Sequence, residues 1–259
     1  MHYREFAPGV DAARFVECYW LLEDVAPGSV QRVVPDGRPE LILHLGEPFE
    51  SLHAGQWQAQ PHCFLAGQLT GPLLLRASGA ARILGVRFRP GGAGQLLGMP
   101  MQELTGRVVD AGGLGLRRLA NLSTVAQVEQ ALLALERGAA DPLVDEAARL
   151  LAQSTDVGAA AALLRVSPRQ LERRFKHRVG ISPKHFARIR RFQHVFHALE
   201  ADSAGWVDAA AACGYYGQAH LVRDFRAFTG EAPTHLLATD DLATHFLSHF
   251  SKTGPQSRA

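Results

Sequence analysis

The sequence predicts an α+β protein with a β-rich N-terminal domain, a barrel or sandwich, and an all-α C-terminal domain. Three observations predict this fold. Turn residues separate short apolar runs up to about residue 94, helix-forming residues dominate after it, and the helical half contains an internal repeat. The chain has 259 residues, of which 47% are hydrophobic and 20% charged, so each domain has enough apolar residues to form a core.

The N-terminal domain is expected over residues 1–94. Short apolar runs such as 40–45 and 82–88 are separated by turn residues, among them Pro35-Asp36-Gly37 and Gly71-Pro72. Short strands with turn signals at this spacing are typical of an antiparallel sandwich or barrel. We therefore expect antiparallel strands throughout this domain.

Residues 95–140 are expected to form a helical connector. Ser123-Thr124 precedes a helical pattern over 125–137, and Gly138 is expected to end that helix. Asp141-Pro142 then places an N-cap residue before a proline at the first helical position. These signals predict that the all-α domain spans 141–238 and that a tail follows over 239–259.

The all-α domain contains a duplication, in which four residue types recur with the same gaps of 4, 5 and 3 after fifty positions. The two sets are Leu171, Phe175, Gly180 and Pro183, and then Leu221, Phe225, Gly230 and Pro233. Each copy predicts a helix, a turn and a second helix. The first helices are expected over 156–164 and 206–213, the second over 168–179 and 218–229, and a linking helix over 183–199.

Positive charge is concentrated in the first copy of the repeat. The net charge of the chain is +2, but residues 165–191 carry ten basic side chains and one acidic, a net charge of +9, which leaves −7 for the remainder. A basic stripe on an otherwise acidic protein indicates a partner with a phosphate backbone. The alternative is a solvated helix face, although such faces usually mix both signs.

The repeat has the pattern of two helix-turn-helix units, in which the second helix enters the DNA major groove. Arg binds guanine and Gln binds adenine with paired hydrogen bonds. The linking helix is about 25 Å long at 1.5 Å per residue, and successive major grooves lie about 34 Å apart. One chain could therefore read two adjacent half-sites. A helical repeat that binds protein, or simple core packing, explains the apolar stripe but not the recurrence of Arg on both outer faces.

Residues 164–176, 180–184, 213–225 and 230–233 resemble the AraC/XylS family of bacterial transcription regulators. The resemblance implies two helix-turn-helix units joined by a long helix, and sequence-specific binding of double-stranded operator DNA. It places the base contacts on Arg169, Glu172, Arg173, Gln218, Ala219 and Arg223. We expect phosphate contacts from Ser167, Lys176, Gly217 and Arg226.

Residues 34–37 and 85–92 resemble a sensor-type domain found before this DNA-binding domain in part of the family. The resemblance implies a cupin-like β fold that senses a small-molecule effector or forms a homodimer. The candidate ligand pocket consists of Arg38, His44, Arg87 and Arg89. The three arginines could bind an anionic ligand there, or could instead form hydrogen bonds that stabilise turns.

No metal site, cofactor or catalytic residue is expected. The histidines lack H-x-H spacing, and the three cysteines are widely separated. Without a signal peptide or a long apolar segment, a cytoplasmic bacterial protein acting at the nucleoid is expected, with RNA polymerase as a further partner. The rival readings are a β-domain enzyme with a helical accessory, and an adaptor that binds RNA or protein.

Overall fold

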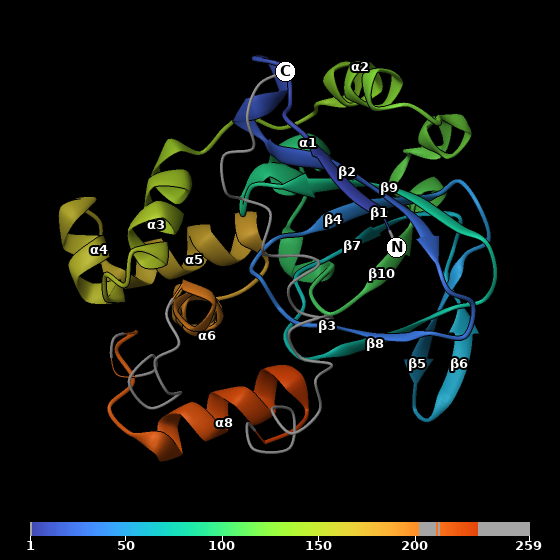
Figure 1. The fold of residues 1–259 in the computed structure, drawn as a ribbon. Coiled ribbons are helices and arrows are strands. Elements are labelled where there is room, and N and C mark those ends of the chain that lie inside the picture. Colours follow the sequence, from blue (N-terminus) through green and yellow to red (C-terminus); the bar gives the residue numbers. More distant parts are fainter. Residues whose placement is uncertain (1, 202–210, 212, 233–259) are drawn as a thin grey trace.

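The computed structural model describes residues 2–201, 211 and 213–232, and it has a β-rich half and a helical half (Figure 1). The β-rich half consists of two antiparallel sheets. The six-stranded sheet has the order β1 (His2–Phe6), β2 (Val16–Val25), β9 (Ala81–Phe88), β4 (Glu40–His44), β7 (Cys63–Ala66) and β10 (Val108–Asp110). The four-stranded sheet has the order β3 (Val30–Val33), β8 (Leu73–Ala77), β5 (Phe49–His53) and β6 (Gln56–Ala59).

Both faces of the larger sheet are buried, as β4 illustrates. Successive side chains of a strand point to opposite faces. Ile42 joins the apolar cluster that includes Phe49 and Phe64, whereas Leu41 and Leu43 join the cluster that includes the helices after β9. This two-sided burial explains why the sequence of β4 is an apolar run without alternation. The β-rich domain expected from the sequence is confirmed.

The segment after β9 contains α1 (Gly92–Leu97), α2 (Val125–Leu135), several short 3-10 helices and one further strand. That strand, β10, pairs with β7, so the sheet continues beyond the domain boundary expected at residue 94. Strand β10 has only three residues, which are too few for the alternation of buried and exposed side chains to be recognised in the sequence. Thr124 caps α2, but the helix ends at Leu135, two residues earlier than expected, because the amides of Arg137 and Gly138 donate to carbonyl groups of α1.

The helical half contains α3 (Pro142–Ala152), α4 (Val157–Leu163), α5 (Pro168–Val179), α6 (Pro183–Ala201) and α8 (Gln218–Thr229). Asp141 and Ser167 are N-caps, and Gly180 and Gly230 end α5 and α8 in the left-handed conformation, as expected. The expected helix over 206–213 and the tail over 239–259 lie almost wholly outside the described residues. None of the described helices has the length and apolar character that a membrane crossing requires.

The repeated apolar residues of both units pack around the linking helix α6. Leu171, Phe175, Leu221 and Phe225 are buried in one cluster with Phe192 of α6. The ring centroids of Phe192 and Phe225 are 5.4 Å apart, in an edge-to-face arrangement. The matched spacing of the two copies therefore reflects two equivalent ways of packing against one central helix.

Candidate nucleic-acid interface

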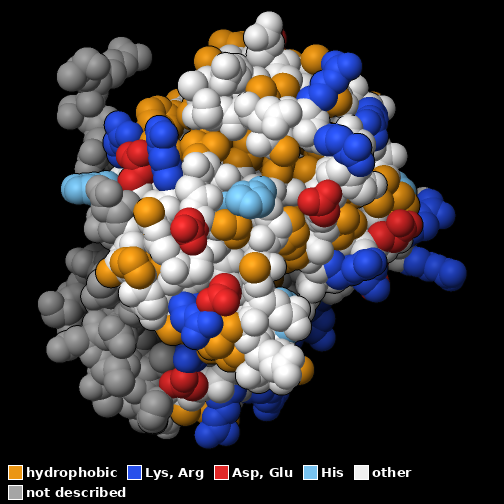
Figure 2. All heavy atoms as spheres, turned by 90° about the vertical axis from the view of Figure 1, so that its right-hand side faces the viewer, with side chains coloured by type: hydrophobic (Ala, Val, Ile, Leu, Met, Phe, Trp, Pro, Cys, Tyr) orange, Lys and Arg blue, Asp and Glu red, His pale blue; other side chains and the backbone are white. Residues whose placement is uncertain are grey.

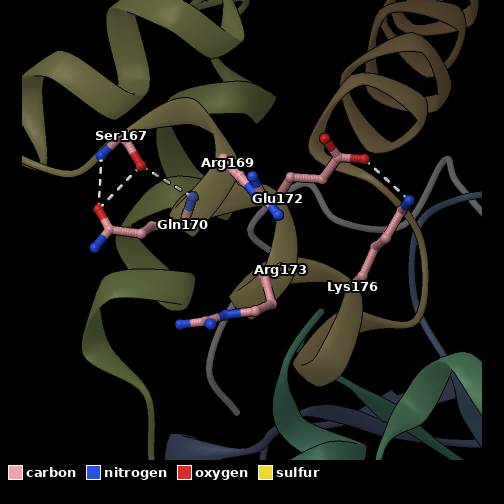
Figure 3. Close-up of a pocket in the computed structure, with 6 residues that line it drawn as sticks. All are labelled: Ser167, Arg169, Gln170, Glu172, Arg173 and Lys176. Atoms are coloured by element: carbon pink, nitrogen blue, oxygen red, sulfur yellow. Dashed lines mark hydrogen bonds and ion pairs between the residues drawn. The ribbon is translucent and has the colours of Figure 1, made fainter.

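The first recognition helix, α5, begins with a capping box. The amide of Gln170 donates to Ser167 Oγ at 3.2 Å, and the amide of Ser167 donates to Gln170 Oε1 at 3.0 Å. Leu171 and Phe175 point inward, so the opposite face of the helix lies open to solvent. That face borders an open hollow of about 710 Å³ lined by Ser167, Arg169, Gln170, Glu172, Arg173 and Lys176 (Figure 3).

Some charged residues of α5 form ion pairs within the chain, whereas others are exposed without such a pair. Arg174 pairs at 2.7 Å with Asp141, the N-cap of α3, and so joins α5 to α3. Lys176 pairs with Glu172 one turn away at 2.9 Å, a half-exposed contact that a phosphate could replace at little cost. Arg169 and Arg173 are exposed and form no ion pair within the described part of the chain. These two guanidinium groups are therefore available to a ligand.

The surface on the β5–β6 side of the molecule differs from α5 because basic and acidic side chains are interspersed there (Figure 2). Arg76 pairs with Glu50 at 2.7 Å, and Arg82 pairs with Glu23 at 2.9 Å. A surface with matched charges has little attraction for a polyanion. The helical half is therefore the better candidate for binding nucleic acid.

The second recognition helix, α8, presents an equivalent face. Leu221 and Phe225 are buried, whereas the predicted contact residues are exposed; these are Gly217, Gln218, Ala219, Arg223 and Arg226. Arg223 stands fifty positions after Arg173 and occupies the same place on its helix. Both second helices therefore expose the residue types expected to read bases.

Asp224 orients α8 and was not predicted from the sequence. Its side chain is 1% exposed and accepts hydrogen bonds from Arg188 of α6, at 2.6 and 3.1 Å, and from the hydroxyl of Tyr215 at 3.3 Å. Burial raises the pKa of Tyr215, and the neighbouring Asp224 carboxylate raises it further. An acidic residue beside Leu221, Phe225 and the other buried positions of α8 is the sequence signal that could have revealed this contact.

The β-rich half contacts the C-terminal end of each recognition helix. Thr105 Oγ1 donates to the carbonyl of Gly180, directly after α5, at 2.7 Å. Arg32 of β3 donates to the carbonyl of Thr229, at the end of α8, and pairs with Glu231 at 2.5 Å. The β-rich half therefore helps to set the placement of both recognition helices.

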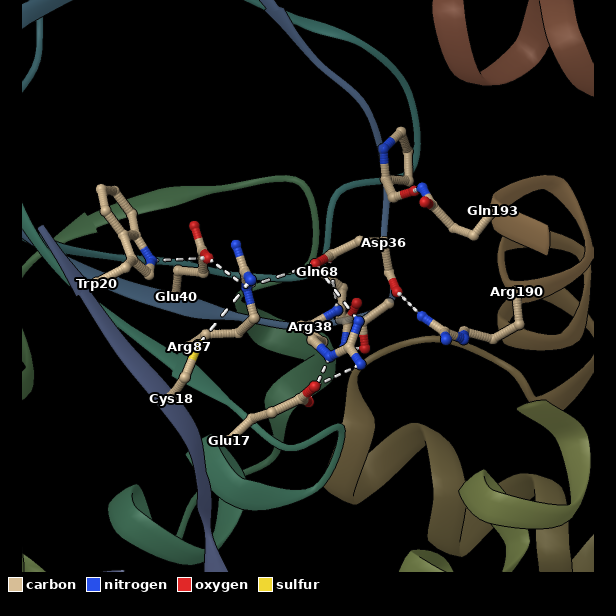
Figure 4. Close-up of polar contacts among 12 residues, drawn as sticks. Glu17, Cys18, Trp20, Asp36, Arg38, Glu40, Gln68, Arg87, Arg190 and Gln193 are labelled. Carbon is tan, nitrogen blue, oxygen red and sulfur yellow. Dashed lines mark hydrogen bonds and ion pairs between the residues drawn. The ribbon is translucent and has the colours of Figure 1, made fainter. Parts of the chain in front are cut away.

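Residues 35–38 of the β-rich half also contact the middle of α6 (Figure 4). Gln193 donates to the carbonyl of Pro35 at 2.6 Å, and Arg190 donates to the carbonyl of Asp36 at 3.2 Å. Burial lowers the pKa of Arg190 to about 10, and repulsion from Arg38 contributes to this shift. The two halves are thus joined along the helix that links the helix-turn-helix units.

A cavity of about 80 Å³ lies between the two sheets. Its lining is mostly apolar, with polar groups from Gln31, Glu40, His44 and Gln60. His44 Nε2 lies 3.3 Å from Gln60 Oε1, whereas its buried Nδ1 has no hydrogen-bond partner among the described residues. Burial lowers the pKa of His44 to about 4, so its ring is neutral at pH 7. The cavity can thus hold a small apolar group.

Of the four residues of the predicted ligand pocket, His44 lines this cavity and the three arginines lie outside it. Arg87 is buried and pairs with Glu40 at 2.9 Å, behind the cavity wall. Arg38 binds Glu17 through two nitrogens, and Arg89 donates to a backbone carbonyl. Arg38 and Arg89 line a different hollow, against α3 and α6. The structure therefore does not bring the four residues together. No group of three His, Cys, Asp or Glu side chains able to hold a metal occurs among the described residues.

Two family models match the chain. A helix-turn-helix domain model matches residues 160–239, and a family described as "Domain of unknown function (DUF6597)" matches residues 4–110. No curated protein matches the chain.

Several solved structures are similar in fold. ToxT from Vibrio cholerae O395 has a TM-score of 0.48 at 7% identity, with 85% of this chain and 98% of that chain covered. The AraC-like transcriptional activator CuxR has a TM-score of 0.30 at 14% identity, with 69% and 77% covered. A cupin domain of an XRE-family regulator from Enterobacter cloacae has a TM-score of 0.26 at 19% identity, with 34% and 96% covered.

The helix-turn-helix match, together with the two exposed recognition helices, defines a DNA-binding transcription regulator. The helix-turn-helix domain is of the AraC type and follows a separate N-terminal domain, which is consistent with the AraC/XylS family that the sequence resembles.

Proposed function

We propose that the chain reads two successive major grooves of double-stranded operator DNA, one with α5 and one with α8. The observation that supports this proposal most directly is the equivalence of Arg173 and Arg223. Both are exposed at the same place on helices that pack against α6 through the same apolar positions. A duplex that meets both helices presents two half-sites to one chain.

The base contacts in this proposal follow from the chemistry of each side chain. Arg169, Arg173 and Arg223 suit guanine, Gln218 suits adenine, and Glu172 suits the amino group of cytosine. Ala219 offers only a methyl group, which suits the thymine methyl. Phosphate contacts are assigned to Ser167, Lys176, Gly217 and Arg226.

The test is binding of the full chain to duplexes selected from a random pool, compared with single-stranded DNA and RNA at several salt concentrations. With about 6–8 phosphate contacts, log K should fall with log salt at a slope of roughly −5 to −7. A response that does not depend on salt, or equal binding of single strands, would overturn this proposal in favour of an adaptor.

The proposal includes an effector that binds in the cavity between the sheets. It acts on the DNA-binding half through strand β3, a coupling that we call the β3 route. Gln31 and Val33 line the cavity, whereas Arg32 between them binds the end of α8. Because side chains alternate along a strand, one short strand has one face on the cavity and the other on a recognition helix. The lining suits a small, mostly apolar molecule. A ligand that displaces β3 would thereby bias the position of α8.

The effector route is tested with a small-molecule extract of cells as the effector source. We expect the extract to change the free energy of operator binding by the native chain by about 1–3 kcal/mol. Its effect on the Arg32→Ala variant should be much smaller. Arg82→Ala is the matched control, because Arg82 of β9 pairs with Glu23 of β2, in the other sheet from β3. Equal responses of all three proteins would contradict the β3 route.

The remaining parts of the proposal concern partners. We propose a homodimer formed through the β-rich half, contact with RNA polymerase, action in the bacterial cytoplasm, and no catalysis by the chain itself. Pairing would raise affinity for repeated sites through avidity. Sedimentation of the full chain with and without operator DNA tests the dimer, and a monomer under both conditions would contradict it.

A further inference from the structure

A groove of about 490 Å³ separates the two helix-turn-helix units and is distinct from the base-reading face of α5. One wall comes from the end of α3 and the start of α4, the floor from α6, and the other wall from the turn before α8. The groove also includes His220, in the same first turn of α8 that carries Gln218. It therefore adjoins the DNA-reading end of the second unit.

Among the described residues, the charges that line this groove without an ion pair are Lys184, Arg191 and Asp156, which leaves an excess of positive charge. Lys184 is exposed, and the Arg191 guanidinium carbon lies 5.5 Å from the centre of the Tyr215 ring. Neither residue forms an ion pair within the described ranges. Of the acidic groups nearby, Asp224 is paired with Arg188, whereas the carboxylate of Asp156 accepts the amides of Gly158 and Ala159 at 2.8 and 3.1 Å and keeps its charge. The groove can therefore attract an anion.

An aromatic side chain also lies at the edge of the groove. Tyr216 is 98% exposed, and its ring is parallel to that of His220, with 6.5 Å between the centroids. An exposed tyrosine carries a hydroxyl group that can donate to a phosphate oxygen. A fully exposed aromatic residue beside two available cations is better suited to a nucleic-acid backbone than to a small inorganic anion.

We propose that this groove holds the phosphodiester backbone of the DNA segment between the two half-sites, with Lys184 and Arg191 as phosphate contacts and Tyr216 as a further donor. This assignment rests on the proposed function, because a duplex that reaches both α5 and α8 must cross the space between the units. It adds a central phosphate contact to those expected at the recognition helices. Since phosphates are the same in every sequence, the groove contributes affinity and register but no base preference.

The first test measures salt dependence for Lys184→Ala and Arg191→Met, the latter chosen because methionine keeps an apolar stem against Tyr215. Each variant should reduce the slope of log K against log salt by about 1 and weaken operator and random duplex by the same factor. Arg118→Ala, an exposed arginine of the β-rich half, is the matched control and should leave the slope unchanged. Thermal melting of each variant verifies folding. Unchanged slopes in both groove variants would overturn the assignment.

The second test replaces the charged phosphates between the half-sites by neutral methylphosphonates. Native protein should bind this duplex more weakly, and Lys184→Ala should lose little further affinity on it, because the contact is already absent. Methylphosphonates outside the half-sites should reduce the affinity of both proteins for the duplex by the same factor. If native protein reads both half-sites yet does not respond to the central replacement, the groove assignment is wrong while the proposed function stands. Loss of inorganic phosphate binding in Lys184→Ala without any effect on DNA would assign the groove to a small anion and overturn the proposal.

Discussion

Arg188 of α6 and Asp224 of α8 form an ion pair through two guanidinium nitrogens, at 2.6 and 3.1 Å from one carboxylate oxygen. Asp224 is 1% exposed, whereas the side chain of Arg188 is 31% exposed. The pair joins the linking helix to the second recognition helix. Its position explains how α8 keeps its orientation although Gly217, the residue before it, provides no side-chain cap.

The first prediction concerns this pair. Asp224→Asn keeps the shape of the side chain but removes the charge that holds Arg188, so we expect the free energy of unfolding to fall by about 2 kcal/mol. Footprints should weaken at the half-site read by α8 and persist at the other. Chemical denaturation and footprinting measure the two effects. Glu146→Gln, in an exposed pair with Arg149, serves as the control and should change neither.

The second prediction concerns base reading. Arg173→Ala and Arg223→Ala should each weaken specific binding by about 1–3 kcal/mol and relax preference at different base pairs, because they lie on different recognition helices. Selection of binding sites from random duplexes with each variant measures this. Lys176→Ala should weaken specific and random duplex more evenly. A change of preference at the same base pairs in both arginine variants would refute reading of two grooves by one chain.

The third prediction concerns the junction between the two halves. Gly37 and Gly55 both have left-handed backbones, with φ of 83° and 81°. A Cβ on Gly37 would lie 2.7 Å from the Phe186 ring of α6, whereas a Cβ on Gly55 would have no described atom within 4 Å beyond its chain neighbours. Gly55→Ala should therefore cost only the strain of the backbone, about 1–2 kcal/mol.

Gly37→Ala should cost about 1–3 kcal/mol more, because Phe186 must move within a packed core. Denaturation of both variants measures the difference. Equal losses would show that the loop 35–38 does not pack tightly against α6 in solution.

The fourth prediction concerns pH. His44 has a pKa of about 4 in the folded chain, lowered by burial, against about 6.5 when unfolded. Between these values the unfolded chain binds more protons, so stability falls as pH falls from about 6.5 to about 4. From pH 7 to pH 5 the native chain should lose about 2 kcal/mol relative to His44→Gln. The carboxylates common to both proteins cancel in this comparison, and parallel pH profiles would contradict a buried neutral His44.

Local sequence signals were sufficient for the recognition helices. The structure begins α5 at Pro168 and α8 at Gln218, and ends them at Val179 and Thr229, as predicted. Caps, prolines and left-handed glycines act over three or four residues, so their effect can be read directly from the sequence. The fifty-residue repeat likewise identified the buried stripe, because both copies pack on the same helix.

Contacts between distant residues accounted for what the sequence did not reveal. The amides of Arg137 and Gly138 end α2 by donating hydrogen bonds to carbonyl groups of α1. Strand β10 pairs with β7, and Arg32 pairs with Glu231, 199 positions later in the sequence. A charged residue in a sequence can be a ligand contact or half of an internal ion pair, and composition does not distinguish them. Arg174 and Arg188 form ion pairs with Asp141 and Asp224, whereas Arg173 forms none within the described residues. This difference arises only when the packing of α3, α6 and α8 brings an acid within reach.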